Sequence, residues 1–331
     1  RKNKWFVFSW AYFLVSIFFL LRFDYKVDRT IVADRYMYLP SLGFCIFIGY
    51  LIYETIKKTA HSKIVGKVVL IAVLVAFSFF GRQTYSQVLV WKDSVSLWSR
   101  VIDNYSDEYL AFANRGEAYI SLNRYDLAFL DYNKALEIKP DYGKALNNRG
   151  MLYKLSGKLG LAFNDFNKAI KSDPKNASVY NNRGLIYLYA KKNDLALKDF
   201  NMSIRLDAEI ASAYTNRGLV YDMAGNYDLA ILEYNKSISV NPNFAQGYNN
   251  RAILYKSRGK YNLALKDFNK AIEIDKSSAD FYYNRGNLFK EIEKYDLALA
   301  DYEQALIINP RHASAIHNRT LINNIKEGYN E

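Results

Sequence analysis

The sequence repeats itself every 34 residues. The tripeptide Asn-Arg-Gly, with Ala or Thr in third place in two copies, begins at residues 114, 148, 182, 216, 250, 284 and 318. A fixed period of this length is typical of helix–turn–helix units that stack into a solenoid, because each unit leaves an apolar face that only its neighbour can cover. We therefore predict an all-α solenoid of six full units over 109–312, followed by a capping helix and tail over 313–331.

Further residue columns keep this period when residue 109 is counted as the first position. The first helix has a small residue at Gly116, Gly150, Gly184, Gly218, Ala252 and Gly286. The second helix has an aromatic residue at Tyr132, Phe166, Phe200, Tyr234, Phe268 and Tyr302. Small residues let two helices approach closely, and an aromatic ring fills the space beside them. The pattern resembles the tetratricopeptide (TPR) family, and this resemblance implies a protein-binding solenoid.

Arginine and acidic residues form two matched columns. The arginines are Arg115, Arg149, Arg183, Arg217, Arg251 and Arg285. Each has an acid sixteen residues later, at Asp131, Asp165, Asp199, Glu233, Asp267 and Asp301. We expect a ladder of ion pairs within or between units, each contributing about 0.2–1 kcal/mol if exposed. The alternative is an arginine array that binds a ligand, which would need no matching acids.

Asparagine occupies the sixth position of every unit, where a TPR solenoid lines its groove. These residues are Asn114, Asn148, Asn182, Asn216, Asn250 and Asn284. Side-chain amides both donate and accept hydrogen bonds, which suits an extended peptide. The alternative is that they satisfy groups between helices, and the sequence leaves both hypotheses open. If the asparagines are such struts, the next groove candidates are Lys154, Tyr189, Asp222 and Lys256.

Three apolar runs near the amino end, residues 5–21, 36–53 and 64–80, carry one charge among them. Seventeen or eighteen residues reach roughly 26 Å, close to the thickness of a bilayer core. We expect three transmembrane helices in a membrane domain over 1–90. The lysines of the 54–67 loop favour a cytoplasmic place for it. These expectations describe an integral, multi-pass membrane protein with its TPR units on the extracytoplasmic (periplasmic or luminal) side.

A junction over residues 91–108 links the two parts. Trp98 lies 34 residues before Tyr132, so residues 92–104 read as the second helix of an incomplete leading unit. Residues 33–41 read ADRYMYLPS, and residues 91–98 read Trp-Lys-Asp-Ser-Val-Ser-Leu-Trp. This order of parts resembles the transmembrane and TPR-containing O-mannosyltransferase family and its bacterial membrane relatives.

The resemblance implies a glycosyltransferase of the GT-C type that uses a polyprenyl-phosphate-linked sugar. Within the matched string, Asp34 and Arg35 are the candidates for contacting the lipid phosphate, since guanidinium binds phosphate through two hydrogen bonds. The alternative is a local ion-pair network that shapes the loop. No residue matches the catalytic carboxylate of the family, so we identify no catalytic residue. We expect the chain to be the C-terminal part of a longer enzyme.

Composition excludes several other functions. The net charge of +12 is spread over both parts of the chain, whereas nucleic-acid-binding proteins concentrate basic residues on one face, so we expect no nucleic-acid partner. Cys45 is the single cysteine, which rules out an internal disulfide. None of the three histidines has the spacing of a metal ligand, so we expect no metal.

These observations favour a membrane-anchored scaffold that binds protein or peptide segments in the TPR groove, as part of a protein glycosyltransferase. The alternative is direct participation in sugar transfer through the loop of Asp34 and Arg35. Whether the chain belongs to an enzyme stays open at this point.

Overall fold

The computed structural model describes residues 92–328 and isolated residues between 57 and 82. In the continuous part, fourteen α-helices follow one another without a strand. The first helices of the units, called A helices, are α6 (Tyr109–Ser121), α8 (Gly143–Leu155), α10 (Ala177–Tyr189), α12 (Ala211–Met223), α14 (Ala245–Ser257) and α16 (Ala279–Glu291). The second, or B, helices are α7 (Tyr125–Ile138), α9 (Leu159–Ser172), α11 (Asn193–Leu206), α13 (Tyr227–Val240), α15 (Tyr261–Ile274) and α17 (Tyr295–Ile308). The flanking helices are α5 (Ser94–Asn104) and α18 (Ala313–Gly328). The predicted all-α solenoid is confirmed.

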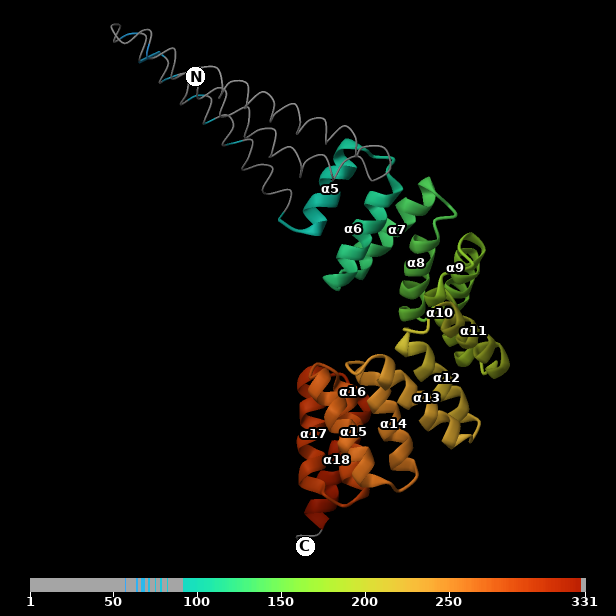
Figure 1. The fold of residues 1–331 in the computed structure, drawn as a ribbon. Helices are drawn as coiled ribbons and strands as arrows, with labels where there is room; N and C mark the ends of the chain where they lie inside the picture. The colour runs from blue at the N-terminus through green and yellow to red at the C-terminus, as the bar shows by residue number, and fades with distance from the viewer. Residues whose placement is uncertain are drawn as a thin grey trace. The chain divides into compact units, whose positions relative to one another are not determined.

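The helices belong to two compact parts of the chain, one ending at Asn123 and the other beginning at Arg124. In the first, α5 packs against α6. In the second, each A helix packs against its own B helix, and each B helix packs against the next A helix (Figure 1). The A helices α10, α12, α14 and α16 also contact one another in sequence. Side chains on neighbouring A helices are therefore close enough to interact directly.

Alanine and aromatic side chains of the B helices form the core between the A and B layers. In α9, the buried residues Ala162, Phe166 and Ala169 are spaced by four and three, so they lie on one face. The aromatic residue of each B helix is fully buried. Phe200, for example, packs with Leu188 of its own unit and Val220 of the next. One buried ring therefore contributes to two interfaces.

Glycine at the eighth position lets the A helix approach the aromatic ring of its B helix closely. A Cβ atom added to Gly184 would lie 2.6 Å from Cε1 of Phe200, and one added to Gly150 would lie 2.7 Å from Cε1 of Phe166. Carbon atoms do not approach so closely without displacement. Ala252 takes the same position beside Phe268, so one unit accommodates the methyl group.

The turn between the A and B helices has a left-handed residue in every unit. Glycine provides it at Gly157, Gly225 and Gly259, with φ between 68° and 77°. The other three turns use Asn123, Lys191 and Glu293 at φ of 57° to 60°. Such a backbone places the Cβ atom close to the following carbonyl oxygen. The turns without glycine are therefore strained.

The prediction of three transmembrane helices is corrected here. In the part of the chain that the structure describes, no helix is long and apolar enough to cross a membrane. The helices from α5 to α18 have 11 to 16 residues and reach at most about 24 Å, short of a bilayer core of about 30 Å. The expected spans 5–21, 36–53 and 64–80 fall almost entirely outside the described residues. The prediction of a multi-pass membrane protein with extracytoplasmic TPR units depended on these spans and is corrected for the same reason.

We expect Gly184→Ala to lower the free energy of unfolding by about 1–3 kcal/mol, because the added methyl group overpacks the site against Phe200. Gly160→Ala is the control, since a Cβ there meets nothing within 4 Å and α9 gains a better helix former. Chemical denaturation of both variants tests this. Equal effects of the two substitutions would contradict the packing argument.

Lys191→Gly should raise the free energy of unfolding by about 0.5–1 kcal/mol, because glycine adopts the left-handed backbone without a steric penalty. Lys191→Ala removes the same long side chain but keeps the Cβ atom. If the alanine variant were stabilised as much as the glycine variant, the gain would not come from the backbone.

Candidate functional site

The arginine column forms bidentate ion pairs with the acids on the B helices. In α10, the Nε and Nη2 atoms of Arg183 each lie 2.8 Å from a carboxylate oxygen of Asp199. The same pairing through two nitrogens joins Arg149 to Asp165, Arg251 to Asp267 and Arg285 to Asp301. Arg217 instead contacts both carboxylate oxygens of Glu233 through Nη2 alone. The predicted ladder is therefore confirmed for these five pairs. They are not exposed pairs, since the acidic side chains are only 4–11% exposed.

Each of these arginines also reaches the preceding unit. The Nη1 atom of Arg183 donates to Oδ1 of Asn167 on α9, at 2.8 Å. The equivalent acceptors for Arg149, Arg217, Arg251 and Arg285 are Asn133, Asn201, Asn235 and Asn269. We call this arrangement, an arginine bonded to the acid of its own unit and to the asparagine of the preceding one, the arginine tie. In the amino-terminal unit, Arg115 donates to Ser99 of α5, which takes the place of that asparagine.

Aromatic rings enclose the tie. The guanidinium of Arg183 lies 5.7 Å from the ring centroids of both Tyr180 and Tyr187. The hydrogen bonds that Arg183 donates to Asp199 raise the pKa of Arg183 further above its usual value. An arginine held by a carboxylate, an amide and two rings has little capacity left for a ligand. The alternative of a ligand-binding arginine array is therefore disfavoured.

The asparagines of the sixth position bond to the neighbouring unit. Asn182 donates from Nδ2 to Oδ1 of Asn147 at 2.9 Å, and Asn216 donates to Asn181 at the same distance. Asn284 donates to Asn249 at 3.0 Å. The pairs α8 and α10, α10 and α12, and α14 and α16 are thus linked by amides, in which a fifth-position carbonyl accepts from a sixth-position amide.

This amide ladder leaves one set of acceptors unused. In the part of the chain that the structure describes, Oδ1 of Asn182, Asn216 and Asn284 accepts no hydrogen bond, and none of the three is fully enclosed. Asn250 differs, because its Oδ1 accepts from Gln246 at 2.7 Å. Asn182 is 8% exposed, and Asn216 and Asn284 are half-buried. These carbonyl oxygens are the hydrogen-bonding capacity that the ladder leaves for N–H groups of a partner.

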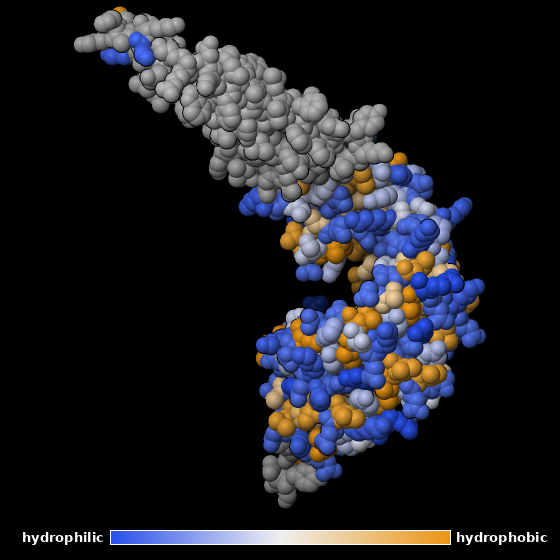
Figure 2. All heavy atoms as spheres, viewed as in Figure 1, coloured by the Kyte–Doolittle hydropathy of each residue, from blue (hydrophilic) through white to orange (hydrophobic). Residues whose placement is uncertain are grey.

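Hydrophobic side chains lie on the same face of the A helices. In α8, Lys144, Asn147, Met151 and Lys154 are spaced by three or four residues and form one stripe. Leu155, Tyr189 and Met223, at the ends of three consecutive A helices, are 59–68% exposed. On the side shown in Figure 2, hydrophobic patches are interspersed with hydrophilic ones over the described helices. We call the surface formed by this stripe, its equivalents on the other A helices and the exposed apolar residues at their ends the A-helix face.

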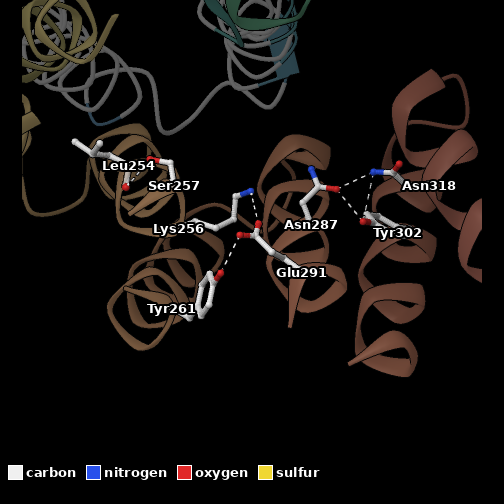
Figure 3. Close-up of polar contacts among 8 residues, drawn as sticks. All are labelled: Leu254, Lys256, Ser257, Tyr261, Asn287, Glu291, Tyr302 and Asn318. Carbon is white, nitrogen blue, oxygen red and sulfur yellow. Dashed lines mark hydrogen bonds and ion pairs between the residues drawn. The ribbon is translucent and has the colours of Figure 1, made fainter. Parts of the chain in front are cut away.

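Charged side chains at the twelfth position complete the A-helix face. Burial lowers the pKa of Lys154 and raises that of Asp222. Lys256 is different, because its Nζ lies 3.0 Å from Glu291 of the next unit, whose other oxygen accepts from the hydroxyl of Tyr261 (Figure 3). Burial would raise the pKa of Glu291, but these two hydrogen bonds lower it overall.

Models of known families decide the nature of the units. Those described as tetratricopeptide repeat match residues 109–142, 177–210, 211–244, 233–266 and 279–312. One described as TPR repeat matches residues 150–189 and 254–292. The chain carries tetratricopeptide repeats. A solved TPR protein from Parabacteroides merdae superposes with a TM-score of 0.60 at 23% identity, covering 74% of this chain and 98% of that one, which shows the shared fold.

Two curated relatives have different functions. The protein O-mannosyl-transferase Tmtc2 of Drosophila melanogaster is 25% identical over 111 residues, which are 34% of this chain and 11% of that protein. The serine/threonine-protein phosphatase T of Aspergillus oryzae is 40% identical over 55 residues, or 17% of this chain and 12% of that protein. The chain spans about a tenth of the length of either relative, so their activities do not transfer to it.

The predicted site residues fall into two groups. Asp34 and Arg35 lie outside the described residues. The asparagines lie on the A helices of the TPR units, where Asn148 donates to the hydroxyl of Tyr132 and Asn114 is half-buried. Their role in a peptide groove stays a prediction. Sequence reasoning missed the Asn133 column, which keeps the 34-residue period as far as Asn269. It also missed the pairing of sixth-position amides with fifth-position asparagines, which are present at 147, 181 and 249 but not in every unit.

A double-mutant cycle on Arg183 and Asp199 should give a coupling energy of about 2–3 kcal/mol, since their bidentate pair is largely buried. The control cycle uses Lys134 and Glu137 of α7, whose side chains are 52% and 65% exposed, and should give less than about 1 kcal/mol. Equilibrium unfolding measures both cycles. Additive losses of stability on substituting Arg183 and Asp199 would contradict a stabilising contact between the two side chains.

Proposed function

We propose that the A-helix face binds extended segments of partner proteins, so that the chain acts as a protein-interaction scaffold. The observation that carries this proposal is the row of unused amide carbonyls at Asn182 and Asn216, beside exposed apolar side chains. An extended peptide has backbone N–H groups along its length and side chains that pack on apolar surface.

The spacing of the ladder supports this function. Contacting helices are about 8–10 Å apart, and an extended chain advances about 3.3 Å per residue. Each TPR unit therefore corresponds to about three residues of a bound peptide. A peptide can meet one amide carbonyl per unit without leaving the extended conformation.

A second candidate function is a part in protein O-glycosylation, with the TPR units holding the acceptor polypeptide. The similarity to Tmtc2 and the ADRYMYLPS string at 33–41 favour it. In that function, Asp34 and Arg35 would contact the phosphate of a polyprenyl-phosphate-linked sugar. Mannosyl transfer to a bound peptide that is lost in Arg35→Ala would support this function. No transfer in the wild type would leave peptide binding alone.

We expect the double variant Asn182→Ala/Asn216→Ala to bind peptide at least tenfold more weakly than the wild type, because each lost hydrogen bond is worth about 0.5–1.5 kcal/mol. The probe is a fluorescent peptide isolated on the wild-type chain from a random display library. Fluorescence anisotropy gives the Kd.

The matched control is Asn167→Ala/Asn201→Ala, on the B helices and outside the A-helix face. It also breaks two bonds between units, those from Arg183 and Arg217, but keeps the carbonyls of Asn182 and Asn216. It should lose similar stability yet retain affinity within about threefold, less than the loss of one full hydrogen bond. Equal loss of affinity in both variants would assign the asparagines to stacking alone, and a library that yields no binding peptide would refute the proposed function.

A further inference from the structure

Two charged side chains on the A-helix face have no partner of opposite charge within the described helices. Lys154 ends α8 and Asp222 ends α12, and both occupy the twelfth position. Among the residues that the structure describes, neither forms an ion pair or a side-chain hydrogen bond. Lys256, at the same position of α14, does have a partner of opposite charge, because it forms an ion pair with Glu291 of the next unit (Figure 3).

The partner is missing because of the residue that follows in the next unit. Glu291 occupies the thirteenth position of α16, one unit after Lys256. The thirteenth position after Lys154 is Tyr189, and the one after Asp222 is Ser257. Neither of these can neutralise the charge before it. Ser257 instead donates its hydroxyl to the carbonyl of Leu254 (Figure 3).

Both charges are half-buried, which makes the missing partner costly. Burial disfavours the charged forms, lowering the pKa of Lys154 and raising that of Asp222. The buried hydroxyl of Tyr234 has no hydrogen-bond partner among residues 92–328, and the negative charge of Asp222 adds to burial in raising the pKa of Tyr234. Opposite charges brought by a ligand would offset the lost hydration at both sites.

Apolar side chains lie beside and between the two charges. Leu155 and Met223 directly follow Lys154 and Asp222, and Tyr189 occupies the same position in the unit between them. Their exposed fractions are 68%, 61% and 59%. We call Lys154, Leu155, Tyr189, Asp222 and Met223 the charged stripe. It has a positive end, an apolar centre and a negative end.

We propose that the charged stripe binds an extended peptide that places an acidic side chain on Lys154 and a basic side chain on Asp222, with apolar residues between them. The proposal rests on the peptide-binding function of the A-helix face. Two units correspond to about 16–20 Å, so the two charges of the peptide are about six residues apart. At this separation they point to the same side in a strand and in a polyproline II helix.

Charge complementarity favours such a peptide over other occupants. A nucleic acid would bring phosphates to Asp222, where like charges repel. A purely apolar segment would cover Lys154 and Asp222 and leave two buried charges unpaired. A mixed-charge peptide pairs both ends and covers the apolar centre.

The test uses a labelled peptide of sequence SESLLLSKS and two relatives with equal end charges, SKSLLLSKS and SESLLLSES. The wild-type chain should bind the mixed peptide at least tenfold more tightly than either relative, since hydrogen bonds to charged groups are the stronger ones. Lys154→Glu should reverse the preference and favour SKSLLLSKS. Asp222→Lys should favour SESLLLSES.

Controls separate local charge from net charge and folding. Lys198→Glu and Glu209→Lys change the same charges at exposed positions outside the stripe and should leave all three affinities within about twofold of the wild type. Lys154→Met removes the charge without reversing it and should weaken only the peptides that carry Glu at the Lys154 end. Circular dichroism shows whether Lys154→Glu folds. If it does not, Lys154→Met takes its place in the test.

Each outcome decides between the two proposals. Equal binding of all three peptides, lost on substitution of Asn182 and Asn216, would overturn the charge assignment and leave peptide binding intact. Failure of the library to yield any peptide would refute the proposed function itself. Self-association that blocks SESLLLSKS, seen by sedimentation, would identify a second copy of the chain as the occupant and overturn the proposal.

Discussion

The arginine tie is the interaction on which the stack depends. One guanidinium bonds to the acid of its own unit through two nitrogens and to the asparagine of the preceding unit through the third. Its planar, rigid fork fixes distance and direction at both partners, which an ammonium could not do. The tie therefore sets how each unit sits on the one before it. The buried aromatic rings add hydrophobic stabilisation, which depends less on direction than the hydrogen bonds of the tie do.

The amide ladder serves stacking and recognition together. The Nδ2 groups of Asn182 and Asn216 hold consecutive A helices, while their Oδ1 atoms remain available. The two hypotheses for the asparagine column are thus not exclusive, because an amide has donors and an acceptor that can serve different partners. A ligand that bonds to the free carbonyl would also polarise the bond between units.

The sequence predicted the parts that repeat and missed those that depend on how units meet. The spacing of sixteen residues paired Arg183 with Asp199 because both lie within one helical hairpin. The bond from Arg183 to Asn167 depends on the rotation between units, which no single unit encodes. The left-handed turn at Lys191 had no glycine to signal it. Apolar run length alone predicted transmembrane helices, whereas no helix in the described part of the chain is long and apolar enough to cross a membrane.

Different positions of the A helix serve the stacking of units and the recognition of a ligand. The seventh position is arginine in all six units, whereas the twelfth changes from Lys154 to Leu188, Asp222 and Lys256 in four consecutive units. Identical arginines favour a constant spacing of the A helices, because each tie joins the acid of its own unit to the asparagine of the preceding one. Varied residues at the ends of those helices can then differ in charge without disturbing the stack. The spacing of a ligand's contacts is thus set by the ties, and their chemistry is set by the twelfth position.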